Sequence, residues 1–435
     1  MTEPAWVQHA IWWQVYPLGF VGAFPAEPPP GPDEHRLRRI IEWFDHAVEL
    51  GASGVALGPI FVSKTHGYDT TDHRRIDPRL GDDGDFDELI TEAHRRGLRV
   101  LLDGVFNHVG TDFPRYRDAV AGDDTSWFLP TGSGEFETFE GHGELVALNH
   151  DNPDVVDYTV DVMTHWLGRG ADGWRLDAAY AVPDRFWAQV LPRVRAEFGD
   201  AWFVAEVIHG DYSAHVREAG VDSVTQYELW KAIWSSLNDG NFHELDWALQ
   251  RHNDFLDVFV PMTFIGNHDV TRIASKLENT RHLEHALVLL LTIGGTPSIY
   301  AGDESAYLGV KEERVGGDDA VRPEFTAPGT GVGDRGRDIY RLHQYLIGLR
   351  RRHPWLHTAR TSSVALTNTG YVYRTSYGAE ALVVALNIDD ASMSLSLRDV
   401  GLAEGRIVAG SGAPPQDVLS QAEIEPHGWL IVAPG

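Results

Sequence analysis

Short apolar runs alternate with amphipathic helical stretches along most of this 435-residue chain, and this alternation restricts its fold more than any other feature. Residues 98–102 form an apolar run that follows Gly97, which is typical of a buried strand. In residues 37–48 the apolar positions recur with helical spacing, and Gly51 follows as a stop signal. Strands and helices that alternate with short connections predict parallel strands joined by right-handed crossovers.

We expect eight such strands, which indicates an α/β fold with a closed (β/α)8 TIM barrel rather than an open sheet. The expected strands are residues 11–15, 54–57, 98–102, 172–177, 202–206, 221–227, 258–264 and 298–300. The expected helices include residues 37–50, 153 onward, 183–198, 213–219, 228–237, 243–252 and 281–291. One further helix is expected to begin at Asp85 in a capping box with Glu88, and Asn152 is expected to cap the helix at Pro153.

Two regions depart from this alternation. Residues 109–150 are rich in Gly, Asp, Thr and Phe without periodicity, so we expect an insertion after the third strand. From residue 357 short alternating runs such as YVYRTSY predict a separate antiparallel β domain. The predicted organisation is therefore a barrel of residues 1–108 and 151–356, the insertion, and a C-terminal domain of residues 357–435. A proline-rich loop is expected at residues 26–32.

The charge balance limits the classes of partner. Lys and Arg number 36 against 64 Asp and Glu, a net charge of −28, which disfavours nucleic acids and anionic membranes. The chain has no cysteine, so it uses neither disulfides nor thiol chemistry. Its N-terminus does not resemble a secretory signal and no apolar run is long enough for a membrane span. We therefore expect a cytoplasmic protein, of open oligomeric state, whose substrate is neutral and which binds neither nucleic acid nor membrane.

Polar residues gather where the expected strands end. They are Asp103, Asn107 and His108 after the third strand, Arg175 and Asp177 on the fourth, Glu206 and His209 after the fifth, and Asn267, His268 and Asp269 after the seventh. One such cluster is most simply a satisfied structural network, because buried polar groups need partners. Four clusters at the carboxyl ends of barrel strands share one face, which is where barrel active sites lie.

The residue types restrict the chemistry. The sequence has no nucleophile elbow, dinucleotide fingerprint or phosphate loop, whereas paired carboxylates fit glycoside hydrolysis. Arg175 and Asp177 share a strand face, and a guanidinium keeps a neighbouring carboxylate ionised, as a nucleophile requires. Glu206 follows three apolar residues, and apolar surroundings raise a carboxyl pKa, as a general acid requires. Asp103 is expected to brace Arg175.

Four segments in this order resemble the α-amylase family, glycoside hydrolase family 13: DGVFNH (103–108), GWRLD (173–177), AEVIH (205–209) and FIGNHD (264–269). GYD (67–69), LVALN (145–149) and GTPSIYAGDE (295–304) support the resemblance. AEVIH and LVALN are similar to the neopullulanase and cyclomaltodextrinase branch. The sequence begins almost at the first expected strand, so we expect the N-terminal domain of that branch to be absent.

The resemblance implies a retaining, double-displacement mechanism on a barrel with a domain B insertion and a C-terminal β-sandwich. It implies Asp177 as the nucleophile, Glu206 as the general acid/base and Asp269 as the carboxylate that binds and distorts the sugar. The substrate-binding residues that it implies are Tyr68, Asp69, His108, Arg175, His209, His268 and Arg272. His73 departs from the family, in which an aromatic residue is common.

No cofactor is expected for the chemistry itself. Asn107 occupies the position that binds a structural calcium ion in many members of the family. The short insertion does not offer the 6–8 oxygen ligands that calcium takes. Asn107 is therefore either a calcium ligand or a loop anchor.

These features predict a retaining α-glycoside hydrolase of short linear or cyclic α-glucans. Ala178 follows the expected nucleophile, which favours α-1,4 links, because a valine is usual in enzymes that cut α-1,6 links. A transglycosidase or disaccharide isomerase of the same family is an alternative, since both use the same covalent intermediate. A non-catalytic binding subunit is a third reading, and the presence of all three carboxylates disfavours it.

Overall fold

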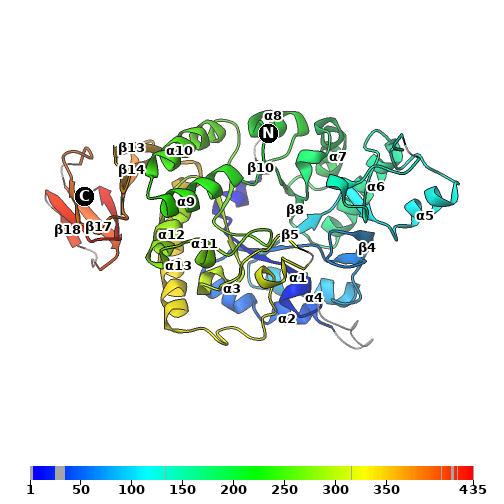
Figure 1. Cartoon of the computed structure of the whole chain (residues 1–435), viewed down its shortest axis with the longest axis horizontal. Helices are drawn as coiled ribbons and strands as arrows, with labels where there is room; N and C mark the ends of the chain where they lie inside the picture. The colour runs from blue at the N-terminus through cyan, green and yellow to red at the C-terminus, as the bar shows by residue number, and fades with distance from the viewer. Residues whose placement is uncertain are drawn as a thin grey trace. The chain divides into compact units, whose positions relative to one another are not determined.

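The computed structural model describes residues 3–24, 35–132, 134–314, 316–402, 404–412, 416–418 and 420–434. The chain divides into two compact units (Figure 1): unit 1 comprises Met1–Thr225 and Lys311–Gly331, and unit 2 comprises Gln226–Val310 and Val332–Gly435. Together the units supply the eight parallel strands of a (β/α)8 barrel, which confirms the predicted fold class. None of the helices in the described part of the chain is long and apolar enough to cross a membrane.

Unit 1 contributes six parallel strands in the order β10-β9-β8-β5-β2-β1. They are β1 (Trp12–Val15), β2 (Gly54–Leu57), β5 (Arg99–Gly104), β8 (Gly173–Leu176), β9 (Trp202–Ala205) and β10 (Ser223–Val224). Every residue of β1, β2, β8, β9 and β10 is buried, as expected for parallel strands whose two faces are both covered.

The helices of unit 1 are α1 (Pro17–Phe20), α2 (Leu37–Ile41), α3 (Phe44–Leu50), α4 (Asp83–Arg95), α6 (Pro153–Gly168), α7 (Asp184–Glu197) and α8 (Tyr212–Ala219). Asn152 caps α6 by accepting a hydrogen bond from the backbone N–H of Asp154 at 2.9 Å, as predicted. The single helix expected at residues 37–50 is instead two, because the chain departs from regular helix at Trp43, whose ring stacks on Trp13.

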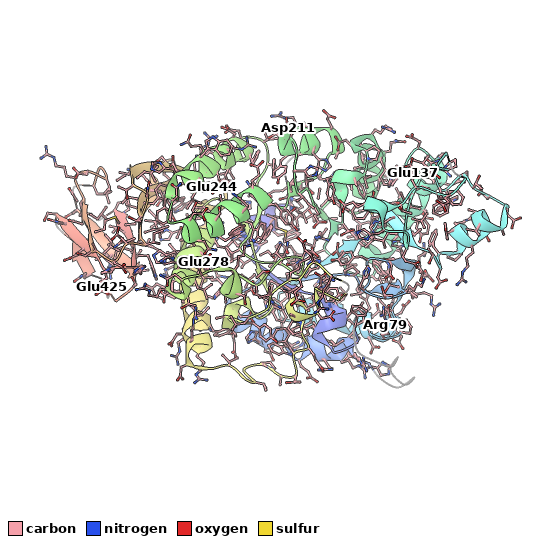
Figure 2. The ribbon with its side chains drawn as sticks, viewed as in Figure 1. Arg79, Glu137, Asp211, Glu244, Glu278 and Glu425 are labelled. Carbon is pink, nitrogen blue, oxygen red and sulfur yellow. The ribbon has the colours of Figure 1, made fainter. Side chains whose placement is uncertain are left out.

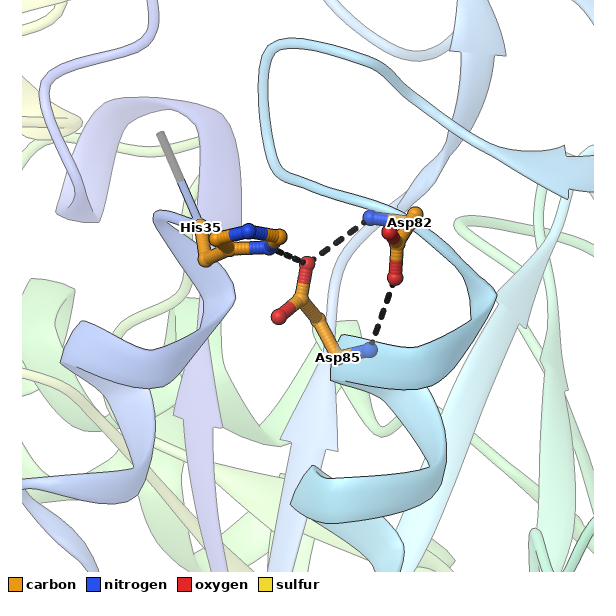
Figure 3. A group of neighbouring side chains, drawn as sticks. All are labelled: His35, Asp82 and Asp85. Atoms are coloured by element: carbon orange, nitrogen blue, oxygen red, sulfur yellow. Dashed lines mark hydrogen bonds and ion pairs between the residues drawn. The ribbon is translucent and has the colours of Figure 1, made fainter. Parts of the chain in front are cut away.

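The capping box of α4 lies three residues earlier than predicted (Figure 3). Asp82 is the N-cap, and the Asp85 carboxylate accepts from the backbone N–H of Asp82 at 2.9 Å. Gly81 permits this approach, because a Cβ there would lie 2.2 Å from Oδ2 of Asp85. Nδ1 of His35 lies 2.7 Å from the same oxygen, and Nε of Arg38 lies 3.2 Å from Oδ1. The first helical turn is polar, so the apolar pattern in the sequence begins too late to reveal it.

Unit 1 also carries the segments that connect its strands. These include a hairpin of β3 (Phe61–Ser63) and β4 (Thr70–Ile76), and a second antiparallel pair of β6 (His108–Gly110) and β7 (Leu145–Ala147) with α5 (Pro114–Ala121) between them. β6, α5 and β7 belong to the region predicted as an insertion, whose boundaries stay a prediction, as do those of the other domains. The proline-rich loop predicted at residues 26–32 lies outside the described residues.

Unit 2 contains the remaining barrel elements. They are α9 (Tyr227–Asp239), α10 (Phe242–Leu256), β11 (Met262–Phe264), α11 (Ile273–Lys276), α12 (Leu283–Thr292), β12 (Thr296–Tyr300) and α13 (Asp334–Arg352). Strands β11 and β12 pair in parallel. Nine of the ten residues of α12 are buried, and Glu284 is the exception, so this helix is part of the core rather than a surface helix.

The C-terminal part of unit 2 is antiparallel, as predicted. Its six-stranded sheet has the order β13-β14-β15-β20-β17-β18, and β16 pairs separately with β19. The strands are β13 (Arg360–Leu366), β14 (Gly370–Tyr377), β15 (Glu380–Asn387), β16 (Met393–Ser396), β17 (Gly405–Gly410), β18 (Gln416–Val418), β19 (Gln421–Ile424) and β20 (Trp429–Pro434). Side chains from both sheets share one apolar core, which includes Val383, Leu395, Ile424 and Val432.

Buried histidines are expected to make the protein sensitive to mild acid. Burial lowers the pKa of His252 to about 4, although the ring donates from Nε2 to the carbonyl of Gly294 at 2.9 Å. An unfolded chain protonates its histidines near pH 6.5, so stability that is present at pH 7 is lost as the pH falls toward 4. His252 alone is expected to contribute about 2 kcal/mol to the loss of stability between pH 7 and pH 5.

Urea unfolding of the wild type and of His252→Gln at pH 7 and pH 5 measures this contribution. The glutamine keeps a donor for the Gly294 carbonyl but does not titrate. The fall in unfolding free energy between the two pH values is therefore expected to be smaller in the variant by about 2 kcal/mol. An equal fall in both proteins would show that His252 does not titrate with folding.

Candidate active site

Arg175 lies at the centre of a buried charged cluster in unit 1. The parallel register of β5 and β8 places Asp103 opposite Arg175, and Nη1 of Arg175 donates to both carboxylate oxygens of Asp103 at 2.7 Å. Arg175 is 6% exposed and Asp103 is 1% exposed. The predicted bracing of Arg175 by Asp103 is therefore confirmed.

The same guanidinium contacts the two carboxylates that the sequence assigns to catalysis. Nη1 of Arg175 lies 3.3 Å from Oδ1 of Asp177, and Nη2 lies 2.6 Å from Oε1 of Glu206. Ala178 adopts a left-handed conformation with φ 45°, and its backbone N–H donates to Oε2 of Glu206 at 3.0 Å. The Arg175 guanidinium and the backbone amide of Ala178 thus hold the two carboxylates close together. The surroundings of Glu206 are therefore less apolar than the sequence indicates, because its carboxylate contacts both of these polar groups.

Burial and charge oppose each other in this cluster. Burial by itself lowers the pKa of Arg175, but the negative charges of Asp103 and Glu206 prevail and raise it well above its usual value. Burial raises the pKa of the Asp103 carboxyl to about 6, against the lowering effect of Arg175. Arg175 therefore carries its charge at every physiological pH.

Tyr68 and His108 extend the cluster. The Tyr68 hydroxyl donates to Oδ2 of Asp103 at 3.1 Å. Nε2 of His108 donates to the Tyr68 carbonyl at 3.0 Å, and the Asn107 amide nitrogen donates to Nδ1 of His108, also at 3.0 Å. Burial lowers the pKa of His108 to about 3, so the ring is neutral. Both ring nitrogens have partners within the chain and the residue is 1% exposed, so His108 faces inward in this structure.

Asn107 is part of this hydrogen-bonded network. It is 4% exposed and its side chain orients His108. Among the described residues, the one group of three His, Asp or Glu side chains with metal-like spacing is His35, Asp82 and Asp85, which serves the α4 cap. No comparable set surrounds Asn107 in that part of the chain, and a calcium ion at Asn107 stays a prediction.

Asp69 and His209 have opposite exposures. Asp69 is 2% exposed and accepts a hydrogen bond from the Thr65 hydroxyl at 2.7 Å, so it is placed to fix its own loop. His209 is exposed, and its ring centroid lies 5.4 Å from that of Tyr180. Of these two predicted substrate-binding residues, the structure leaves His209 accessible to a ligand.

Unit 2 carries a second group of predicted residues, which follows β11. Nε2 of His268 lies 3.1 Å from Oδ2 of Asp269, whose side chain is 30% exposed. The Asn267 side chain accepts from the backbone N–H of Asp269 at 2.9 Å and donates to the Tyr227 hydroxyl at 2.8 Å. This network fixes the Asp269 backbone while the carboxylate stays accessible.

Arg272, which the resemblance implies as a substrate-binding residue, is fully buried in this structure. It is 0% exposed, Nη1 lies 2.9 Å from Oδ1 of Asp303, and the guanidinium lies 3.9 Å from the centroid of the Tyr300 ring. Burial raises the pKa of Asp303 to about 6, against the lowering effect of Arg272. Arg272 is therefore placed to brace the segment that follows β12.

The sequence did not indicate three side chains that lie beside the unit 1 cluster. Phe139 stacks on His108 with ring centroids 4.8 Å apart and planes at 16°. The Tyr180 hydroxyl donates to Oε1 of Glu140 at 2.8 Å. Phe139 and Glu140 belong to the region without periodicity, so no pattern marks them.

His73, which departs from the family pattern, takes the place of an aromatic ring. Its ring stacks on Phe106 with planes at 15°, and Nε2 donates to the carbonyl of Val105 at 2.7 Å. Burial lowers the pKa of His73 to about 4, so the ring is neutral and packs as an aromatic residue would.

The chain is similar in sequence and in fold to known proteins. Residues 14–135 and 121–366 match the family described as alpha amylase, catalytic domain. The chain is 30% identical over 384 residues to neopullulanase 2 of Thermoactinomyces vulgaris, which covers 81% of this chain and 64% of that protein. It is 29% identical over 435 residues to a cyclomaltodextrinase of a Bacillus species, which covers 90% of this chain and 75% of that one. A solved cyclomaltodextrinase structure aligns with a TM-score of 0.84 at 26% identity and covers 100% of this chain and 79% of that chain.

Proposed function

The chain belongs to the α-amylase family, and on that premise we propose that it is a retaining glycoside hydrolase of short linear or cyclic α-glucans, with a preference for α-1,4 links. The observation that carries the proposal is the position of Asp177 and Glu206 on the two terminal nitrogens of one buried guanidinium. A retaining enzyme needs its two carboxylates close together, because one of them attacks the sugar directly.

The proposed reaction has two steps. In the first, a carboxylate oxygen of Asp177 bonds to the anomeric carbon, the glycosidic bond breaks, and its oxygen takes the proton of Glu206. In the second, Glu206 takes a proton from water, the water oxygen bonds to the anomeric carbon, and the ester to Asp177 breaks. Two inversions leave the product with the α configuration of the substrate.

The neighbouring groups support each step. Arg175 keeps Asp177 ionised for the attack, and its own charge is secured by Asp103. The backbone N–H of Ala178 donates to Glu206 and stabilises the carboxylate that forms when Glu206 gives up its proton. Asp269 is proposed to bind the sugar at the cleavage site, because its carboxylate is accessible and its backbone is fixed.

The proposed substrate class rests on the relatives, which are a neopullulanase and cyclomaltodextrinases. A transglycosidase of the same family stays an alternative, since a sugar can replace water in the second step. We propose an oligosaccharide substrate, neither nucleic acid nor membrane as a partner, the cytoplasm as the location, and chemistry that itself needs no cofactor.

Incubation with maltose, maltotriose, β-cyclodextrin, isomaltose, sucrose and trehalose tests the proposal. We expect maltotriose and cyclodextrin to be cleaved, the first-formed product to be the α anomer by NMR, and sucrose and trehalose to be stable. Longer or rearranged sugars from maltotriose alone would favour the transglycosidase or isomerase. A β anomer, or no cleavage of any α-glucan by folded protein, would contradict the proposal.

A further inference from the structure

A cavity of about 540 Å³ is formed by the two loops that follow the catalytic carboxylates. Its walls include Tyr180 from the loop after Asp177, and Val207 and His209 from the loop after Glu206. The start of α8, capped by Asp211 (Figure 2), closes another side. None of the steps proposed above uses this cavity, which has the size of a typical small-ligand pocket.

The chemistry of its walls suits a sugar ring. The Tyr180 and His209 rings lie 5.4 Å apart, tilted by 58°, and offer both aromatic faces and polar edges. The cavity begins at the residue after Glu206, and the backbone N–H of Tyr180 donates to the Glu206 carbonyl at 3.3 Å. Because Glu206 is proposed to protonate the departing oxygen, a cavity next to it is placed to receive the leaving group of the first step.

One hydrogen bond holds the Tyr180 side chain in this wall. Its hydroxyl donates to Glu140, which belongs to the segment of residues 109–150. Glu140 has φ 50° and ψ 26°, a left-handed conformation that is strained for a residue with a side chain. Burial and the negative charge of Glu140 both raise the pKa of Tyr180, so the hydroxyl keeps the proton that it donates.

The preceding residue, Phe139, joins the same segment to the catalytic cluster. Phe139 stacks on His108, while Glu140 accepts from Tyr180. Two consecutive residues therefore join this segment to the loops that follow β5 and β8. Glu140 thus makes its contact with Tyr180 from a left-handed backbone, while Phe139 beside it contacts His108.

We propose that Glu140 is a positioning residue, and that its hydrogen bond fixes Tyr180 as the wall of a binding site for the leaving-group sugar. This inference rests on the proposed function and names a determinant of its specificity. The same site receives an acceptor sugar in the second step, by microscopic reversibility. The Glu140–Tyr180 pair therefore favours sugar leaving groups over small ones and favours sugar acceptors over water.

Two substrates with the same glycosyl part separate this role from a general structural one. Maltotriose has a sugar as its leaving group, whereas α-maltosyl fluoride has a fluoride ion, which needs no sugar site. The quantity compared is kcat/KM on maltotriose divided by kcat/KM on the fluoride. We expect Tyr180→Phe and Glu140→Ala each to lower this ratio about fivefold, which is the effect of losing one hydrogen bond. The double variant is expected to lower it no further, because both changes remove the same bond.

Two more variants complete the test. Glu140→Gln keeps an acceptor oxygen for Tyr180 and is expected to restore most of the ratio. Glu137→Ala removes an exposed carboxylate from the same segment (Figure 2) and is expected to leave the ratio unchanged. An equal fall on both substrates, or an unchanged ratio in Tyr180→Phe, would overturn the inference while leaving the proposed function intact. A folded wild type that is inactive on both substrates would overturn both.

Discussion

Replacing Arg175 with methionine is expected to lower the free energy of unfolding by about 3–5 kcal/mol at pH 7. The guanidinium contacts Asp103, Asp177 and Glu206, and its removal leaves three buried carboxylates without their cation. Removal of one partner from a buried ion pair costs far more than the pair contributes by itself, because the remaining charge stays desolvated. Urea unfolding followed by circular dichroism measures the loss.

Two further variants isolate the cause. Arg185 forms an exposed ion pair with Asp151 at 2.7 Å, so Arg185→Met is the matched control and is expected to cost no more than about 1 kcal/mol. Adding Asp103→Asn to Arg175→Met removes one uncompensated charge and is expected to recover part of the stability. If Arg175→Met is as stable as the control, the cluster does not depend on its cation.

Asp177→Asn is expected to lower kcat/KM on maltotriose by about 10⁴-fold or more. The amide cannot bond to the anomeric carbon as a carboxylate does, and it has nearly the same shape, so the binding of substrate is largely kept. Arg175 retains Asp103 and Glu206 in this variant, so the protein is expected to fold.

An exposed aspartate supplies the control for this variant. Asp161→Asn removes a carboxylate from the surface of α6 and is expected to keep wild-type kinetics. If Asp177→Asn keeps more than a tenth of the wild-type activity, another group is the nucleophile. A folded wild type that binds α-glucans but cleaves none of them would favour the interpretation of the chain as a binding subunit.

The sequence predicts the barrel well because its strands are short, apolar and separated by helices with clear periodicity. The pairing of Asp103 with Arg175 follows from the same pattern, since both residues lie near the ends of adjacent parallel strands. Two helix starts show the limits of the pattern. Asn152 with Pro153 is recognised at once, whereas Asp82 is missed because Asp83 and Gly84 carry no apolar side chain that would mark the first turn of α4.

The side chains around the cluster are harder to predict. Glu140 and Phe139 lie in a segment without periodicity, and their roles depend on a left-handed backbone at Glu140 that no sequence pattern marks. Arg272 shows a different limit, because a family motif indicates a position but not its exposure, and its role in substrate binding stays a prediction. The structure places its guanidinium on Asp303, fully buried.

The central claim is that Asp177 forms a covalent bond to the sugar, and trapping that bond tests it most directly. A 5-fluoro α-glycosyl fluoride forms the ester quickly, and water removes it slowly because the ring fluorine destabilises the oxocarbenium-like transition state. After proteolysis and mass spectrometry, we expect one fluoroglycosyl unit on the peptide that contains Asp177, located on its carboxylate. A label on a different residue, or turnover of the reagent without any label, would contradict it.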